Sequence, residues 1–151
     1  MQKNIILLIE DEITTGEMLT QALELSEIQV VWAKDGKTAL DAMQRGKFDL
    51  IILDLKLPGI SGDEILEQIR KIDAYVEVIV HTNYATNTFD PAVIKRLIKL
   101  GVIEYINKGA KADLVSLVEK IKERLRPFSE EQRMNKLEYM PAESFREGVR
   151  I

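Results

Sequence analysis

The stretch IILLIEDE, residues 5–12, joins five consecutive apolar residues to three acids. A second stretch, LIILDLKLPG at residues 50–59, places Asp54 directly after four apolar residues. Apolar runs without alternation are typical of parallel strands that helices cover on both faces. If the two strands are neighbours, their carboxyl ends meet, and Glu10, Asp11 and Asp54 converge at one edge of the sheet.

The rest of the chain continues this pattern. Short apolar runs predict five strands, at residues 5–9, 29–32, 50–53, 76–80 and 102–106. Apolar residues at helical spacing follow each run and predict five helices. The predicted fold class is therefore α/β, a doubly wound five-stranded parallel sheet with (βα)5 order.

Helix ends support this reading. Ser61, with Glu64 three residues later, predicts a capping box. The pair Asp90-Pro91 predicts an N-cap followed by proline at the first helical position. Gly46 and Gly101 are expected to end the second and fourth helices.

A length of 151 residues suits one domain and a short appendage. We expect the domain at residues 1–125, because Arg126-Pro127 breaks the last helical pattern. Residues 126–151 are expected to form a C-terminal extension, with a short helix from Ser129 to about Met140 and then a tail. Its 26 residues are too few for a helix-turn-helix effector domain.

Composition narrows the partners and the compartment. The net charge of −4 gives no electrostatic reason to expect nucleic acid or an anionic membrane, so direct DNA binding is disfavoured. Without cysteine, disulfides, thiolate metal sites and cysteine nucleophiles are excluded. No apolar run is long enough for a signal peptide or a membrane span, so we expect a soluble, cytoplasmic protein.

The loops after the predicted strands also carry Thr82 and Lys108. Taken singly, an acid before a helix is usually a capping residue and a lysine is usually solvated. Asp54 differs, because a carboxylate at the end of a buried strand needs a partner, and Lys108 is the natural one. Together the groups predict phosphoryl transfer. In this reading Asp54 attacks phosphorus, Mg²⁺ is held by Asp11, Asp54 and a backbone carbonyl, and Lys108 and Thr82 contact the phosphoryl oxygens.

These residues resemble the receiver domain of two-component response regulators, which has a flavodoxin-like fold. The resemblance covers about residues 1–125. It is carried by four stretches in the expected order, namely ILLIEDE at 6–12, LDLKLPG at 53–59, Thr82, and YINK at 105–108.

The resemblance implies a signalling switch that assists its own phosphorylation and dephosphorylation, rather than an enzyme. A sensor histidine kinase or a phosphotransfer protein would phosphorylate Asp54. Glu10 and Asp11 would take the acid-pair positions around Mg²⁺, with the backbone carbonyl of Lys56 as a further ligand. Output would pass through contacts with a downstream protein.

The resemblance also implies how the switch works. Thr82 would turn towards the phosphoryl group and let Tyr105 move inward, which would reshape the face of the fourth helix, fifth strand and fifth helix. A homodimer through this face is one arrangement that the resemblance allows. Lys56 and Tyr84 match positions that tune the lifetime of the acyl phosphate.

Three features depart from the usual family pattern. Gly109 follows Lys108 where the family usually has proline, so we predict a trans peptide bond between them. Asn83 follows Thr82 where a small residue is usual, and is expected to act on the phosphoryl pocket. The loop from Thr82 to Asp90 is a few residues longer than usual.

Two alternatives stay open. One is a small Mg²⁺-dependent phosphohydrolase that uses Asp54 as nucleophile, although Lys56 stands where a second acid is expected. The other is a receiver-like interaction module that works without phosphate. Two further residues are assigned to packing: His81, and Trp32, which is expected to lie at a distance from the site.

Overall fold

The computed structural model describes residues 3–83, 90–108 and 113–125. Within these ranges, strands and helices alternate as predicted. The strands are β1 (Ile5–Ile9), β2 (Gln29–Ala33), β3 (Leu50–Leu53), β4 (Glu77–Thr82) and β5 (Val102–Asn107). The helices are α1 (Ile13–Leu25), α2 (Gly36–Arg45), α3 (Gly62–Ile72), α4 (Pro91–Lys99) and α5 (Asp113–Leu125).

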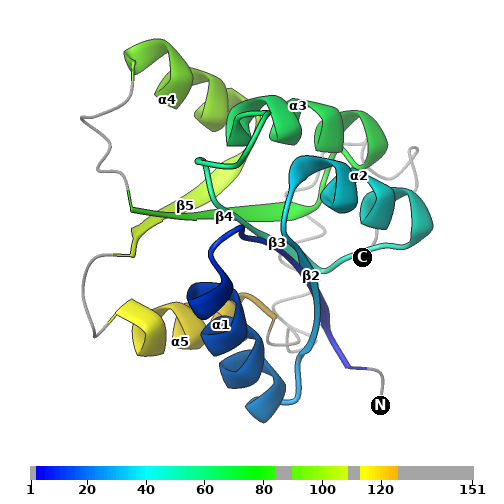
Figure 1. The fold of residues 1–151 in the computed structure, drawn as a ribbon, viewed down its shortest axis with the longest axis vertical. Helices are drawn as coiled ribbons and strands as arrows, with labels where there is room; N and C mark the ends of the chain where they lie inside the picture. Colours follow the sequence, from blue (N-terminus) through cyan, green and yellow to red (C-terminus); the bar gives the residue numbers. More distant parts are fainter. Residues whose placement is uncertain (1–2, 84–89, 109–112, 126–151) are drawn as a thin grey trace, which may run out of the picture.

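The five strands form one parallel sheet in the order β2-β1-β3-β4-β5. Helices α1 and α5 cover one face, and α2, α3 and α4 cover the other (Figure 1). The fold is therefore the doubly wound, flavodoxin-like (βα)5 fold. After β2 the chain crosses to the other side of β1 to form β3, so the direction of winding reverses between β1 and β3. In open sheets of this kind, ligands bind at the carboxyl ends of the two strands that flank this reversal.

Two apolar layers hold the sheet between its helices. The layer under α1 and α5 packs Leu19, Leu23, Leu117 and Ile121 on the sheet. The layer under α2, α3 and α4 is larger and includes Met43, Ile65, Leu66, Ile69 and Leu97. Burying one such side chain contributes about 1.5–3 kcal/mol, so the central strands form a rigid base for the loops at their ends.

Three strands differ from the predicted bounds, since β2 and β5 each run one residue further and β4 shifts at both ends. β4 begins at Glu77 rather than Val76, because the Val76 N–H donates to the side chain of Asp73 in the preceding turn. It ends at Thr82 rather than Val80, because Lys108 N donates to Thr82 O at 2.9 Å and extends the ladder with β5. His81 and Thr82 therefore belong to the strand, not to the loop.

Helix ends were predicted with mixed success. Asp90 caps α4 as expected, since its side chain accepts from Ala92 N at 2.9 Å, and the helices before Gly46 and Gly101 end where predicted. The capping box at Ser61 was wrong, because its side chain makes no capping hydrogen bond. The start of α3 is instead held by a backbone bond, in which Gly62 N donates to Leu55 O at 2.9 Å.

Several predictions fall outside the described residues. These are the extension at 126–151 with its short helix, the loop residues 84–89 including Tyr84, and the peptide bond between Lys108 and Gly109. In the described ranges, no helix combines the length and the apolar character that crossing a bilayer requires.

Candidate functional site

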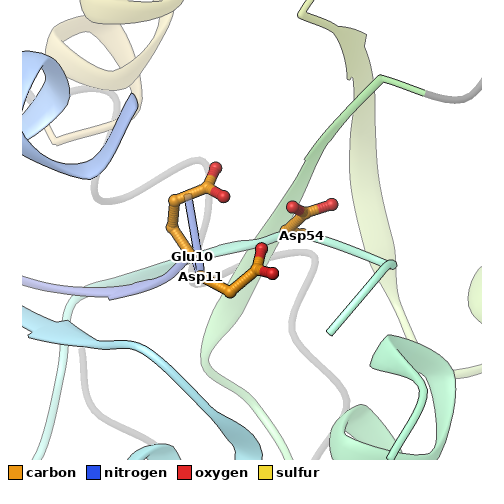
Figure 2. Close-up of side chains that lie close together, drawn as sticks. All are labelled: Glu10, Asp11 and Asp54. Atoms are coloured by element: carbon orange, nitrogen blue, oxygen red, sulfur yellow. The ribbon is translucent and has the colours of Figure 1, made fainter. Parts of the chain in front are cut away.

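The three predicted acids meet at the carboxyl edge of the sheet. Glu10 and Asp11 follow β1, and Asp54 follows β3. Glu10 N donates to Ala33 O and Asp54 N donates to Ile9 O, each at 3.0 Å, so the strand ladders continue one residue further and fix both backbones. Carboxylate oxygens of the three acids lie within 4.8 Å of one another. Figure 2 shows the three groups gathered around one space.

Lys108 joins two of these acids. Its ammonium lies 2.9 Å from Asp54 Oδ2, as expected, and also 2.6 Å from Glu10 Oε1. The contact with Glu10 was not predicted, since it depends on how far the lysine reaches across the end of β4. The other Glu10 oxygen, Oε2, accepts from Glu12 N at 3.1 Å.

Burial shapes the ionisation of this cluster. Glu10 is only 1% exposed, and burial raises its pKa to about 7 despite the hydrogen bond from Lys108. Burial acts on Lys108 in the opposite sense, but hydrogen bonds to Glu10 and Asp54 outweigh it, so the pKa of Lys108 lies above its usual value. One ammonium cannot balance three carboxylates, so the cluster favours either a bound proton or a second cation.

A pocket of about 310 Å³ opens over the cluster. Its lining combines charged and polar side chains from the ends of β1, β3, β4 and β5, namely Asp11, Glu12, Asp54, Lys56, Thr82, Asn83 and Lys108. Asp54 Oδ1 accepts from Lys56 N at 3.2 Å, which turns its carboxylate towards the pocket. Glu10 lies beneath the pocket rather than in its wall.

The donor set fits Mg²⁺. Asp11 and Asp54 offer carboxylate oxygens at the pocket, with the buried Glu10 close behind. Mg²⁺ prefers one or two carboxylates and retains several waters, for which the pocket has room. All the acids supply hard oxygen ligands, and the chain has no cysteine that would favour a softer metal.

Thr82 and Tyr105 lie on the same face of the sheet. The Thr82 hydroxyl is buried in the pocket wall and has no hydrogen-bond partner among the described residues. Tyr105 pairs with Val80, two residues before Thr82, and packs against the layer under α2, α3 and α4. Burial and the negative charge of Asp54 raise the Tyr105 pKa to about 12, so its hydroxyl stays protonated at neutral pH.

Sequence reasoning missed two residues at this site. Trp32 was expected to lie away from it, but its indole N–H donates to Glu10 O at 2.8 Å. Gly62 begins α3, and a Cβ there would meet Leu55 Cα at 2.7 Å and Asp54 O at 2.8 Å. Both contacts depend on how strands and helices approach in space, and no sequence pattern indicates them.

The fold and site define a class of protein: small doubly wound α/β domains with an acidic, lysine-bearing pocket where the winding reverses. Within this class, residues 6–122 match the family described as the response regulator receiver domain. The chain belongs to this family, whose members act in phosphorylation-dependent signalling.

Individual relatives agree with this assignment. Sporulation initiation phosphotransferase F of Bacillus subtilis is 33% identical over 84 residues, which are 56% of this chain and 68% of that protein. The uncharacterized transcriptional regulatory protein YkoG of the same species is 39% identical over 82 residues, which are 54% of this chain and 36% of that protein. The chain spans about a third of the length of YkoG and of a Thermotoga maritima cyclic di-GMP phosphodiesterase.

Solved structures share the fold. A CheY-like receiver domain protein from Methanospirillum hungatei is 28% identical and superposes with a TM-score of 0.74, covering 89% of this chain and 99% of that one. The response regulator TrrA from Thermotoga maritima, solved in complex with Mg²⁺-BeF, is 31% identical with a TM-score of 0.67. That alignment covers 81% of this chain and 99% of TrrA.

Proposed function

We propose that this chain is a phosphorylation-dependent switch that accepts a phosphoryl group on Asp54. The observation that carries the proposal is the convergence of Asp54, Lys108 and the acid pair at one pocket. The donor would be a phosphohistidine of a sensor kinase or of a phosphotransfer protein. Family membership supports that class of donor.

In the proposed reaction, an Asp54 oxygen attacks phosphorus as the P–N bond to histidine breaks. The imidazole leaves with the electron pair of that bond, as a neutral ring whose other nitrogen already carries a proton, and Asp54 becomes an acyl phosphate. Lys108 lies 2.9 Å from Asp54 Oδ2, so its ammonium is already placed to balance charge on the phosphoryl oxygens. Because the lysine is held by strand pairing, little reorganisation is needed.

Mg²⁺ would be held by Asp11, Asp54 and the backbone carbonyl of Lys56, with Glu10 acting from behind through water. When bound, the ion supplies positive charge that offsets the charge of the phosphoryl oxygens. The raised pKa of Glu10 supports this assignment, since burial and the nearby Asp54 carboxylate disfavour the charged form of Glu10 in the metal-free cluster, and a bound cation would favour it.

The switch would run from Thr82 to Tyr105. A buried hydroxyl without a partner is costly, and a phosphoryl oxygen on Asp54 would accept its hydrogen bond. Movement of Thr82 would free space on the face where Tyr105 pairs with Val80. The face of α4, β5 and α5 would then change shape and select a downstream protein or a second copy of the chain.

Lys56 and Asn83 would set the lifetime of the acyl phosphate, because both line the pocket and control the approach of water. Tyr84 is assigned to the same role. Residues 1–125 would form the signalling domain, and residues 126–151 a C-terminal extension.

A mass measurement on the purified protein tests the proposal. With acetyl phosphate and Mg²⁺, the wild-type chain should gain one phosphoryl group that is labile in alkali. Asp54→Asn should gain none, and chelation of Mg²⁺ should stop labelling of the wild type. An undiminished adduct on Asp54→Asn, or no adduct on a wild-type protein shown to be folded, would overturn it.

A further inference from the structure

The side chain of Trp32 contacts the backbone of the acid pair. Trp32 lies on β2, paired with Leu8 of β1. Its indole N–H donates to the Glu10 carbonyl at 2.8 Å, one residue beyond the end of β1. This carbonyl and the Asp11 N–H belong to the same planar peptide group. The indole therefore fixes the orientation of the peptide that leads into Asp11.

Helix α1 has a gap that fits this ring. Gly16 is buried in α1, where glycine is disfavoured relative to alanine. A Cβ at Gly16 would come within 2.0 Å of Trp32 Cζ2, 2.2 Å of Cε2 and 2.7 Å of Cη2, all in the outer ring of the indole. The ring thus occupies the space that a side chain at this position would fill.

Lys34 contacts the same ring. Its ammonium lies 5.0 Å from the centroid of the indole, within range of a cation–π interaction. Trp32 is therefore held by α1 through Gly16, by Lys34 and by the Glu10 carbonyl. A ring held at three points has little freedom to rotate, which makes its N–H a fixed donor.

We propose that Trp32 is a positioning residue for Mg²⁺ binding, acting through the Glu10–Asp11 peptide, with Gly16 as the residue that admits it. The inference rests on the proposed function, because it concerns the same metal-binding acids. Hydrogen bonds from neighbouring groups that orient the ligands of a metal often control its affinity. Here the hydrogen bond from Trp32 goes to the carbonyl of Glu10, in the peptide group before Asp11, and not to the Asp11 carboxylate itself.

Four variants test this assignment by calorimetric Mg²⁺ titration. Trp32→Phe keeps an aromatic ring but removes the N–H, and should weaken Mg²⁺ binding about three- to tenfold, as expected for one neutral hydrogen bond. Gly16→Ala should do the same, because its Cβ displaces the indole. Lys34→Met keeps the N–H and removes only one of the three contacts to the ring, so its loss of Mg²⁺ affinity should be clearly smaller than that of Trp32→Phe.

The double variant Gly16→Ala/Trp32→Phe gives the sharpest outcome. Phenylalanine lacks the outer ring that the new Cβ would meet, so Gly16→Ala should cause no further loss of affinity in this background. The labelling rate of Trp32→Phe with acetyl phosphate at saturating Mg²⁺ should stay within about twofold of wild type, since only binding is weakened. A merely structural role would lower thermal stability and leave the Mg²⁺ dissociation constant of the folded protein unchanged.

A spectroscopic readout is independent of activity. Trp32 is the only tryptophan, so the protein has one indole ¹⁵N–¹H resonance. That proton should exchange slowly with water, and its resonance should shift on addition of Mg²⁺. Rapid exchange, or wild-type Mg²⁺ affinity in both Trp32→Phe and Gly16→Ala, would overturn the inference. Failure of the wild-type protein itself to bind Mg²⁺ would instead overturn the proposed function.

Discussion

The ammonium nitrogen of Lys108 lies 2.9 Å from Oδ2 of Asp54, although the two residues are 54 positions apart in the sequence. Their strands, β5 and β3, are separated by β4, so the lysine reaches across the end of β4 to the acid. On the way it also contacts Glu10. One side chain thus holds the ends of β1, β3 and β5 together at the pocket.

Replacing Lys108 tests this role. Lys108→Met removes the ammonium, so the negative charges of Glu10 and Asp54 lose the positive charge that balances them. Without Mg²⁺, the free energy of unfolding should fall by up to about 3 kcal/mol, which is the lower end of the usual cost of breaking a buried ion pair. We expect the lower end because Asp54 borders the pocket and is therefore not fully buried. With the competing cation gone, Mg²⁺ should bind more tightly, while phosphorylation should slow. Urea unfolding and Mg²⁺ titration measure both effects, and weaker Mg²⁺ binding would contradict the account.

The raised pKa of Glu10 predicts the pH dependence of the metal-free protein. Its usual value is 4.5 and its value in the fold is about 7. Between these values, the folded chain keeps a proton that the unfolded chain has lost. The free energy of unfolding should therefore fall as pH rises from about 4.5 to about 7, by at most about 3 kcal/mol.

Glu10→Gln supplies the control for this pH effect. Glutamine does not titrate, so the difference in unfolding free energy between wild type and Glu10→Gln should change across the same interval. Saturating Mg²⁺ should flatten the wild-type profile, because the metal replaces the proton. A constant difference between the two proteins from pH 4.5 to 7 would show that Glu10 does not titrate as described.

The close packing of Gly62 against the backbone of Asp54 and Leu55 should affect the phosphorylation of Asp54. In Gly62→Ala, the new Cβ would meet backbone atoms at 2.7 and 2.8 Å, in the segment that carries Asp54. Because backbone cannot move aside cheaply, we expect a loss of about 1–3 kcal/mol in stability and slower labelling of Asp54. Gly46→Ala is the matched control, since a Cβ there meets nothing within 4 Å. Equal effects of the two substitutions on labelling would refute the link.

Arg70 should matter for stability but not for the site. Its Nε and Nη1 donate to Leu100 O and Val76 O, each at 2.6 Å, and join the end of α4 to the start of β4. Arg70→Met would leave these carbonyls without their donors and should cost about 3 kcal/mol. Arg96→Met removes half-exposed ion pairs to α3 and should cost less than about 1 kcal/mol. Urea unfolding separates the two, and a changed Mg²⁺ affinity in Arg70→Met would contradict the assignment.

The strands and the acids could be predicted from the sequence because their signals lie in neighbouring residues. Each strand is a short apolar run, and each acid directly follows one, so adjacent residues carry the signal. Parallel pairing then brings Glu10, Asp11 and Asp54 together without further information. For the same reason, Asp90 could be identified as a cap from two neighbouring residues.

Contacts between distant elements could not be read in this way. The Glu10–Lys108 ion pair depends on a lysine crossing β4, and the Trp32–Glu10 bond depends on a glycine in α1 opposite the ring. The capping box at Ser61 failed because a tertiary backbone bond from Gly62 to Leu55 took over the start of α3. A prediction from a short sequence motif fails where contacts with another element stabilise a different local structure.

The position of the phosphoryl group within the chain shows directly whether Asp54 is the phosphate acceptor. After reaction with acetyl phosphate and Mg²⁺, borohydride reduces an aspartyl phosphate to homoserine, which peptide mass spectrometry can place at a single position. We expect homoserine at position 54 in the presence of Mg²⁺ and none there after chelation. Homoserine at another aspartate, or the same yield at position 54 without Mg²⁺, would contradict it.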